Sequence, residues 1–356
     1  MINFFFMEEY VQLLIKMIRI PSFSREERPV ANLVRDFLTS KGIVFFEKDN
    51  NTWARNRHWY EGKPVILLNS HIDTVKPVKN WTKDPFGAGL DGDRLTGLGS
   101  NDAGASLVTL LAVFVRLYAV RDLPWNLLFA ASAEEEVSGP QGMESLIGDL
   151  GPLDLAIVGE PTQMQMAVAE RGLMVLDCTA SGKAGHAARD EGENALYKAI
   201  NDILILQNYQ FPEVSPILGP VKLSVTQIQA GYQHNIIPDQ CSFVVDVRTN
   251  EHYTNRTAFK VIKGLISSEV KARSFRLNSS GIPLTHPVVG RAREIGLSCY
   301  GSPTTSDQAA IPYPSVKIGP GDSARSHTAD EYILIPEIEQ GFEIYLKLLK
   351  DLHLPG

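Results

Sequence analysis

The sequence predicts an α/β protein built from two parts. Its 356 residues are too many for one ordinary hydrophobic core. In residues 1–168 and 280–356, short apolar runs typical of buried strands alternate with stretches of helical periodicity. Between them, residues 169–279 follow the order β-α-β-β-α-β of a ferredoxin-like unit. We therefore expect a discontinuous domain with a mixed, twisted sheet flanked by helices, and an inserted ferredoxin-like α+β domain.

The elements of the first domain follow from apolar periodicity and from turn residues. Leu14 and Ile18 recur at helical spacing, and Pro21 interrupts this pattern before a second helix. Residues 65–69 and 126–131 are largely apolar, as in strands buried on both faces. The predicted helices span residues 9–20, 25–40, 105–118, 286–295 and 338–352, and the predicted strands span residues 44–47, 65–69, 126–131, 153–158 and 315–318.

The remaining segments are a loop and the inserted domain. Residues 81–93 are rich in Gly, Asp and Pro, which predicts a loop. In the inserted domain the predicted strands span residues 173–180, 221–229, 241–248 and 274–278, and the predicted helices span residues 194–207 and 255–269.

Composition excludes some classes of partner. The net charge of -7 argues against a nucleic-acid or an anionic-membrane partner. The cysteines, Cys178, Cys241 and Cys299, are odd in number and widely spaced, which predicts free thiols in a reducing, cytoplasmic compartment. The apolar start is too short for a signal peptide, and translation is compatible with a start at Met1 or Met7. No apolar run is expected to span a bilayer.

Polar residues gather where predicted strands end. His71 and Asp73 follow the strand that begins at Val65, and Glu160 follows the strand at 153–158. Ligands bind at the carboxyl ends of strands in open α/β sheets. For His71 and Asp73 alone, capping of the next loop is the simpler interpretation. For Glu160 alone, it is an ordinary turn carboxylate.

Two further acidic positions allow the same pair of interpretations. Asp102 precedes the helix at 105–118, where it serves either as an N-cap or as a cation ligand. Residues 134–136 are three consecutive glutamates at a strand end. They form either a solvated acidic turn or a group of carboxylates that a cation holds together.

Taken together, these positions favour a metal site. Imidazole and carboxylate ligands without thiolate suit zinc, cobalt or manganese. Five ligands, one of them a bridging carboxylate, suit two divalent ions, which would lower the pKa of a shared water. One carboxylate left over would act as general base, and water is the expected nucleophile because no serine or cysteine lies in a recognised nucleophile motif.

The same residues resemble the M20 metallopeptidases, the family of acetylornithine deacetylase, succinyl-diaminopimelate desuccinylase, aminoacylase and glutamate carboxypeptidase. The resemblance covers nearly the whole chain, and the ordered set of motifs carries it more than any one of them. These motifs are His71-Ile72-Asp73, Gly97-x-Gly99-x-x-Asp102, Glu135-Glu136, Gly159-Glu160-Pro161 and His327-x-x-Asp330-Glu331.

The resemblance implies a role for each position. His71 and Glu160 would hold one metal ion, and Glu136 and His327 the other. Asp102 would bridge the two ions. Asp73 would orient His71. Glu135 would act as the general base.

The three consecutive acids leave a question of register. The family pattern of an acid followed by Glu-Glu selects Glu135 and Glu136. A slip by one residue would select Glu134 and Glu135 instead.

The resemblance also extends to the inserted domain. His186, after Gly182, would reach the active site of a partner subunit and stabilise the oxyanion of the tetrahedral intermediate. This implies a homodimer formed through the inserted domain. Asn235 would contact substrate and Arg248 would bind its carboxylate. From spacing alone, His186 is a surface residue in a glycine loop and Arg248 an exposed charge at a strand end.

The sequence departs from the family pattern around Asp102. Leu98 replaces an arginine, Gly104 a lysine and Ala105 a glycine. These changes remove two positive charges near the site and bear on substrate preference.

The implied activity is that of a di-zinc amidohydrolase that hydrolyses an N-acyl amino acid, a small-molecule substrate. The favoured substrate is N2-acetylornithine or a close arginine-pathway analogue. An N-succinyl amino acid is the nearest competing substrate, and Arg325 or Lys183 would then supply the additional cation. Less favoured are a dipeptidase and, outside the enzymes, a non-catalytic binding protein stabilised by metal.

Overall fold

The computed structural model describes residues 4–189 and 191–355, so the question of a start at Met1 lies outside the described residues. The described chain divides into two compact units. The first comprises Met1–Val168, Gly281–Tyr300 and Ser306–Gly356, and the second comprises Ala169–Ser280 and Gly301–Thr305. Residues 301–305 were expected in the first domain, yet they belong to the second unit, where the Arg171 N–H donates to the Ser302 carbonyl at 3.2 Å.

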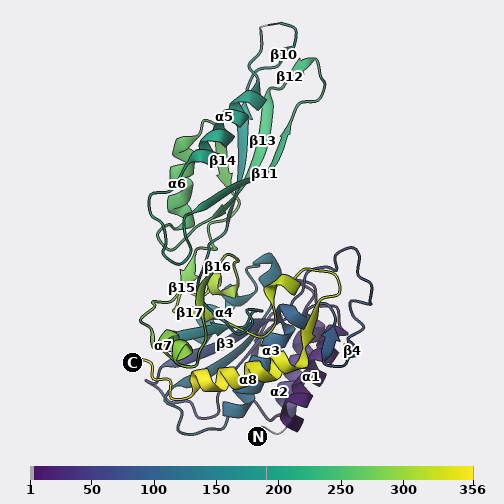
Figure 1. Ribbon diagram of the computed structural model, residues 1–356, viewed down its shortest axis with the longest axis vertical. Helices are drawn as coiled ribbons and strands as arrows, with labels where there is room; N and C mark the ends of the chain where they lie inside the picture. The colour runs from purple at the N-terminus through teal and green to yellow at the C-terminus, as the bar shows by residue number, and fades with distance from the viewer. Residues whose placement is uncertain (1–3, 190, 356) are drawn as a thin grey trace. The chain divides into compact units, whose positions relative to one another are not determined.

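The predicted mixed sheet is confirmed (Figure 1). Its strands follow the order β1-β2-β6-β3-β7-β17-β8-β15, and β16 pairs with β8. The central strands β6, β3, β7 and β17 are parallel, whereas β1–β2, β2–β6 and β17–β8 are antiparallel. The strands are β1 Phe45–Lys48, β2 Asn51–Arg55, β3 Val65–His71, β6 Asn126–Ser132, β7 Leu155–Val158, β8 Met166–Glu170, β15 Ser280–Gly281, β16 Cys299–Ser302 and β17 Ser315–Lys317.

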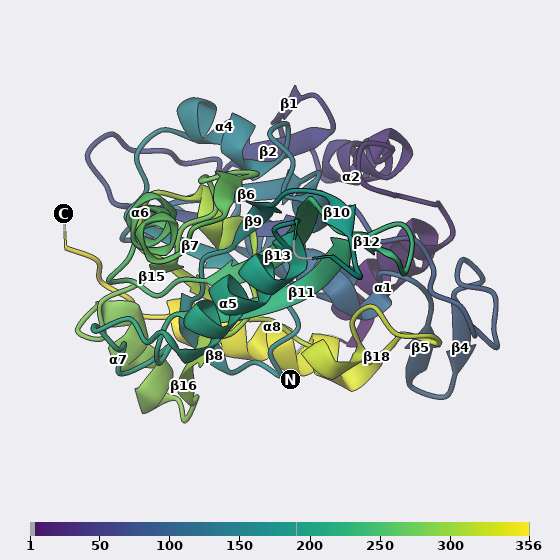
Figure 2. The same ribbon diagram turned by 90° about the horizontal axis from the view of Figure 1, so that it is seen from above.

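Helices cover the sheet of the first unit. α3 packs on β3 and β6 and contacts α1 and α8. α2 packs on β2, the strand next to the edge strand β1 (Figure 2). Met143, Leu146 and Leu150 of α4 join Leu67 and Leu128 of the sheet in a buried cluster. The helices are α1 Phe4–Ile18, α2 Arg28–Ser40, α3 Ala105–Leu117, α4 Met143–Leu150, α7 Pro287–Glu294 and α8 Ile335–Leu349.

α3 is a core helix. Every residue from Ala105 to Phe114 is buried. With the preceding turn it forms the described stretch Ser100–Leu117, which is long and apolar enough by length and composition to cross a membrane, contrary to the sequence expectation, and 78% of it is buried inside the structure.

Several elements of the first unit differ from those predicted. β2 and α4 were not predicted, and α1 begins at Phe4 rather than at residue 9. The predicted loop at 81–93 contains β4 Gly89–Asp91, which pairs with β5 Arg94–Thr96 and, through it, with β18 Tyr332–Leu334. All residues of β4 are exposed, so the strand has no buried apolar face from which it could be predicted.

The second unit has the predicted β-α-β-β-α-β order. Its four-stranded antiparallel sheet has the order β11-β13-β9-β14, and α5 and α6 pack together with it around one core. A short antiparallel pair is formed by β10, which follows β9 in the sequence, and β12, which follows β11. The elements are β9 Met174–Ser181, β10 Gly185–His186, α5 Ala195–Asn208, β11 Lys222–Ala230, β12 Ile236–Ile237, β13 Gln240–Arg248, α6 Asn255–Leu265 and β14 Glu269–Ala272.

The last helix and strand of this unit were predicted at the wrong place. α6 ends at Leu265 rather than at residue 269, and β14 replaces the strand predicted at 274–278. The buried carboxylate of Asp202 accepts the backbone N–H groups of Ser267 and Ser268 at 3.1 and 2.8 Å. These bonds hold the two residues outside the helix, because helical N–H groups would bond to carbonyls four residues earlier.

Candidate metal centre

His71 is the last residue of β3 and is almost fully buried. Its Nδ1 lies 2.9 Å from the carbonyl oxygen of Asp73 and 3.4 Å from Asp73 Oδ1. A proton on Nδ1 satisfies these acceptors and leaves Nε2 with a free lone pair. Asp73 therefore orients the ring through its main chain as well as through its carboxylate.

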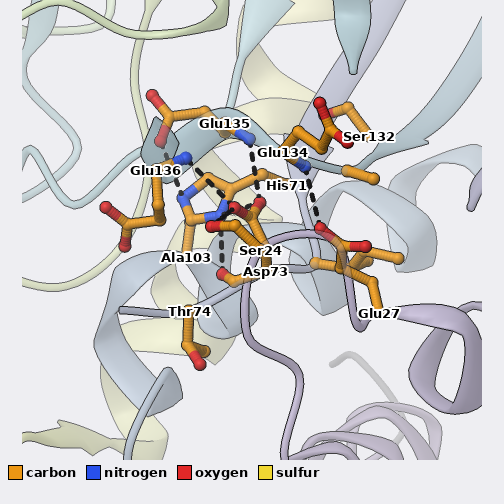
Figure 3. A network of polar contacts seen from close by, with 12 residues as sticks. Ser24, Glu27, His71, Asp73, Thr74, Ala103, Ser132, Glu134, Glu135 and Glu136 are labelled. Carbon is orange, nitrogen blue, oxygen red and sulfur yellow. Dashed lines mark hydrogen bonds and ion pairs between the residues drawn. The ribbon is translucent and has the colours of Figure 1, made fainter. Parts of the chain in front are cut away.

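The Asp73 carboxylate also fixes the turn that carries the acidic run. It accepts the backbone N–H groups of Glu135 and Glu136, each at 3.1 Å, and the hydroxyl of Ser24 at 2.7 Å. Figure 3 shows Asp73 beneath His71, joined to these groups. One buried carboxylate thus connects the end of β3 to the end of β6, and it holds these two segments in one geometry.

The structure places the three glutamates of the acidic run in different surroundings. Glu134 adopts a left-handed conformation, with φ 56°, and its carboxylate accepts the N–H of Gln141 at 3.3 Å. The carboxylates of Glu135 and Glu136 instead lie near His71, within groups whose ligand atoms are less than 4.8 Å apart. The site is therefore lined by Glu135 and Glu136, and not by Glu134.

Asp102 lies in an irregular turn before α3 rather than at a helix cap. Its φ and ψ of −118° and 100° are not helical, and the N-cap position of α3 belongs to Gly104. Oδ1 lies 3.3 Å from His71 Nε2, and Oδ2 lies 3.7 Å from His327 Nε2. One oxygen of Asp102 therefore faces each histidine, which is the arrangement that a bridging carboxylate needs.

Glu160 and His327 complete the cluster. Glu160 follows β7 through Gly159, where a Cβ would lie 2.7 Å from a methyl of Leu110 and 2.9 Å from the Cβ of Ser106, so a side chain there would force its neighbours to move. His327 has φ 57°, and its Nε2 lies 3.0 Å from Glu136 Oε2. The structure thus brings together all six side chains that the sequence singled out in the first unit: His71, Asp102, Glu135, Glu136, Glu160 and His327.

The cluster carries a surplus of negative charge. His71 Nε2 lies 3.8 Å from Glu160 Oε1 and 4.0 Å from Glu135 Oε2. Burial raises the pKa of Glu135 well above its usual value, and the nearby Glu160 carboxylate raises it further. Burial and the Asp102 carboxylate raise the pKa of Glu160 to about 8. These shifts show that the carboxylates are too close to be all ionised without a compensating cation.

The pKa values of the two histidines are raised as well, which favours their charged form. A hydrogen bond to Glu136 raises the pKa of His327 to about 9, although burial opposes it. Burial lowers the pKa of His71, but the hydrogen bonds to Asp102 and Asp73 outweigh burial, so the net shift is upward.

The donor set fits divalent cations. Two groups, His71 with Asp102 and Glu136, and His71 with Glu135 and Glu160, each offer three ligand atoms within 4.8 Å of one another. All of the atoms are nitrogen or oxygen, which suits zinc, cobalt or manganese. The excess of carboxylates supplies the charge that two dications would neutralise.

Two buried acids near the site were not given a role by the sequence. Asp307 accepts the Ser132 hydroxyl at 2.5 Å, and burial raises its pKa to about 6. Glu331 accepts backbone N–H groups of the Asp102 turn. Asp307 follows Ser306, which caps a short 3-10 helix, so the sequence signal is that of a turn. Glu331 belongs to the His327 motif, but nothing in the motif indicates what it contacts.

The residues predicted in the inserted domain lie in the second unit. His186, in β10, is exposed, and its Nδ1 accepts the Ala188 N–H at 3.1 Å, which leaves Nε2 to carry the proton. Arg248 makes two bonds to Asp246, at 2.8 and 3.1 Å, so its guanidinium already has a carboxylate partner. Asn235 is exposed and its backbone carbonyl accepts the Ala187 N–H at 2.9 Å.

Two other positions bear on substrate charge. The guanidinium of Arg325 is paired with both oxygens of Glu337, at 2.7 and 3.1 Å, and so it is not free to bind a second substrate carboxylate. At Gly104, a Cβ would lie 2.5 Å from the Gly99 carbonyl oxygen and 2.6 Å from a methyl of Leu14. The missing lysine at 104 is therefore accounted for by tight packing.

The known proteins that this chain resembles belong to one family of peptidases and deacylases. A model described as peptidase family M20/M25/M40 matches residues 67–351. The succinyl-diaminopimelate desuccinylase of Dinoroseobacter shibae is 26% identical and aligns over 97% of this chain and 99% of its own. The N-acetyl-L-citrulline deacetylase of Xanthomonas campestris is 23% identical over 86% of this chain and 87% of its own.

Solved structures share the fold. An M20 family metallo-carboxypeptidase from Sulfolobus solfataricus superposes with a TM-score of 0.76 at 18% identity, covering 97% of this chain and 99% of its own. A dinuclear metal-binding M20 peptidase from Bacillus subtilis superposes with a TM-score of 0.71 at 19% identity, covering 99% of this chain and 100% of its own.

Proposed function

Because the chain belongs to peptidase family M20/M25/M40, whose members are metal-dependent hydrolases of amide bonds, we propose that it is a di-zinc amidohydrolase of N-acyl amino acids. N2-acetylornithine, or a close arginine-pathway analogue, is the first substrate to test. The observation that supports this proposal is the convergence of His71, Asp102, Glu136, Glu160 and His327 around an additional carboxylate, that of Glu135.

The proposed ligands divide into two sets. His71 and Glu160 would hold one ion, Glu136 and His327 would hold the other, and Asp102 would serve both. When bound, the two cations lower the pKa of the attacking water and polarise the scissile carbonyl.

The proposed base is Glu135. Its raised pKa suits a group that accepts a proton and later returns it near neutral pH. Glu135 takes a proton from water as the water oxygen bonds to the carbonyl carbon. It then delivers this proton to the amide nitrogen as the C–N bond breaks, so the products are a carboxylic acid and a free amine. His186, with the proton on Nε2, donates to the oxyanion from a partner subunit.

Three isosteric variants test these roles. Glu135→Gln is expected to keep its zinc content and to lose turnover by about 10²–10⁴-fold. Glu136→Gln is expected to lose zinc affinity, because an amide is a poor metal ligand. Glu134→Gln is the matched control and is expected to retain zinc and most activity. If Glu135→Gln turns over N-acylamino acids at the parent rate, the assignment of the base is wrong.

The substrate is tested by amine release from acetyl- and succinyl-amino acids and from dipeptides, with added zinc or cobalt. A succinylated substrate is the second candidate, because relatives aligned over nearly their whole length are named desuccinylases. With Arg325 paired to Glu337, Lys183 is the remaining cation proposed for the second carboxylate. A desuccinylase would therefore lose its preference for succinyl over acetyl substrates in Lys183→Met. The parent turning over dipeptides alone would contradict both candidates.

We also propose that the chain is a homodimer through its second unit. Tyr197, Ile200 and Leu204 recur along one side of α5 with 66%, 40% and 48% of their surface exposed. Among the described residues, β11 is an edge strand that pairs with β13 alone. Leu204→Glu is expected to give monomers in light scattering.

Mixing His186→Ala with Glu135→Ala is expected to restore some activity, and no recovery in verified mixed dimers would contradict action across the dimer.

A further inference from the structure

Glu331 makes a set of contacts that the proposed reaction does not explain. It is 2% exposed and lies just before β18. Its Oε2 accepts the N–H of Gly99 at 3.0 Å, and its Oε1 accepts the N–H groups of Asn101 and Asp102, both at 2.9 Å. Three backbone donors of one turn therefore converge on a single carboxylate.

This turn needs such a partner. The first N–H groups of a helical segment have no carbonyl within the helix to bond to, and when buried they are costly to leave unpaired. Gly99 and Asn101 are buried, so water does not satisfy their N–H groups in place of a protein acceptor. Gly99 has φ 75°, a left-handed conformation that turns the chain so that its N–H points toward Glu331. The carboxylate thus satisfies donors that the α3 ladder leaves open.

The same turn sets the direction of Asp102. Because the Asp102 N–H is held by Glu331, the backbone from which its carboxylate projects is held as well. The carboxylate oxygens face His71 and His327, at 3.3 and 3.7 Å. A bridging position tolerates little displacement, since each oxygen must reach a different ion.

Glu331 also lies close in sequence to one of the facing histidines. His327 is four residues upstream, and between them Asp330 bonds to Thr82 and Lys83. The short segment 327–331 therefore contains one proposed ligand, His327, and holds the backbone of another, Asp102, through Glu331. Asp330 lies on the same segment but binds outside the turn, which makes it a matched control.

We propose that Glu331 is a positioning residue of the metal centre, which fixes the Asp102 turn so that one carboxylate can bridge two ions. This inference rests on the proposed function, since it assumes that Asp102 binds both ions. It differs from simple helix capping, because capping would stabilise the fold without altering how the site binds metal.

The first test compares metal affinity with stability. In Glu331→Gln, the NH₂ group faces either the Gly99 N–H or the N–H groups of Asn101 and Asp102, so one or two of the three bonds are lost. The bonds that remain lose the carboxylate charge. We expect the zinc affinity, measured by competition with a chelator, to fall about 10–100-fold, and the visible absorption spectrum of the cobalt form to change. Asp330→Asn is expected to match the parent in both measurements.

The outcomes separate this inference from the proposed function. If the parent binds two ions and Glu331→Gln binds them with equal affinity and the same cobalt spectrum, Glu331 only supports the fold and the inference is wrong. If the parent binds no zinc or cobalt, the proposed function fails and the inference fails with it.

A second test needs no variant, so it holds even if Glu331→Gln does not fold. Hydrogen exchange at the amides of Gly99, Asn101 and Asp102 is measured in the parent after its metal has been removed with a chelator. If Glu331 fixes the turn, these amides are protected without metal, and added zinc changes their protection little. Rapid exchange that slows only when zinc is added would show that the metal, and not Glu331, orders the turn.

Discussion

Replacing Asp73 by asparagine should destabilise the first unit more than any ordinary surface change. The carboxylate is 1% exposed and accepts three hydrogen bonds, from Ser24, Glu135 and Glu136. Asparagine has the same shape but only one acceptor oxygen. Its NH₂ group must therefore face either the Glu135 N–H or the pair of donors on the other side.

The expected loss can be worked out from these bonds. With the amide oxygen placed to accept from Ser24 and Glu136, the Glu135 N–H is left unpaired and buried, at a cost of about 1–3 kcal/mol. The two retained bonds change from charge-assisted to neutral, and each weakens by about 0.5–1.5 kcal/mol. The total is a loss of about 2–6 kcal/mol in the free energy of unfolding.

Tryptophan fluorescence reports the unfolding of the first structural unit, in which Asp73 lies. All of the tryptophans, Trp53, Trp59, Trp81 and Trp125, belong to the first unit, so their signal during urea unfolding of the metal-free protein follows that unit. The control is Asp149→Asn, which removes an exposed ion pair with Lys48 and should change stability by less than about 1 kcal/mol. If the two variants lose the same small amount, Asp73 does not hold the turn.

Three other predictions concern charge and packing. The metal-free site holds protons near pH 7, because the pKa values of Glu160 and His327 are raised to about 8 and 9, so zinc binding should release protons and tighten as the pH rises from 6.5 to 8. Calorimetry in two buffers of different ionisation enthalpy measures the protons, and proton uptake would contradict this. Gly104→Ala should destabilise the first unit by about 1–3 kcal/mol in the same urea assay, because its Cβ would overlap Gly99 and Leu14; an unchanged midpoint would contradict the packing argument. Arg325→Met should leave the ratio of acetyl to succinyl turnover unchanged, because Arg325 is paired with Glu337, and a changed ratio would show that this pair opens to substrate.

The sequence predicted the main elements because apolar patterning carries them. The strand that ends at His71 and the buried helix α3 are nearly continuous apolar runs, so their positions could be read from hydrophobicity. β4 and β14 escaped prediction for a physical reason. β4 is exposed and pairs within a local hairpin, and the place of β14 depends on Asp202, which is distant in sequence and stops α6 early.

The site could be predicted only in part. His71, Glu135, Glu136 and Glu160 follow strands whose carboxyl ends share one edge of the sheet, so strand order alone brings them near one another. Asp307 could not be found in this way. Asp307 reaches Ser132 from a loop that is distant in the sequence. The sequence alone does not distinguish a loop aspartate that is buried from one that is exposed.

Metal counting by anomalous scattering on crystals grown with zinc tests the central claim most directly. We predict two zinc peaks in the first unit, one among His71, Asp102 and Glu160, and one among His327, Asp102 and Glu136. A single peak, or zinc bound only elsewhere on the chain, would contradict the account.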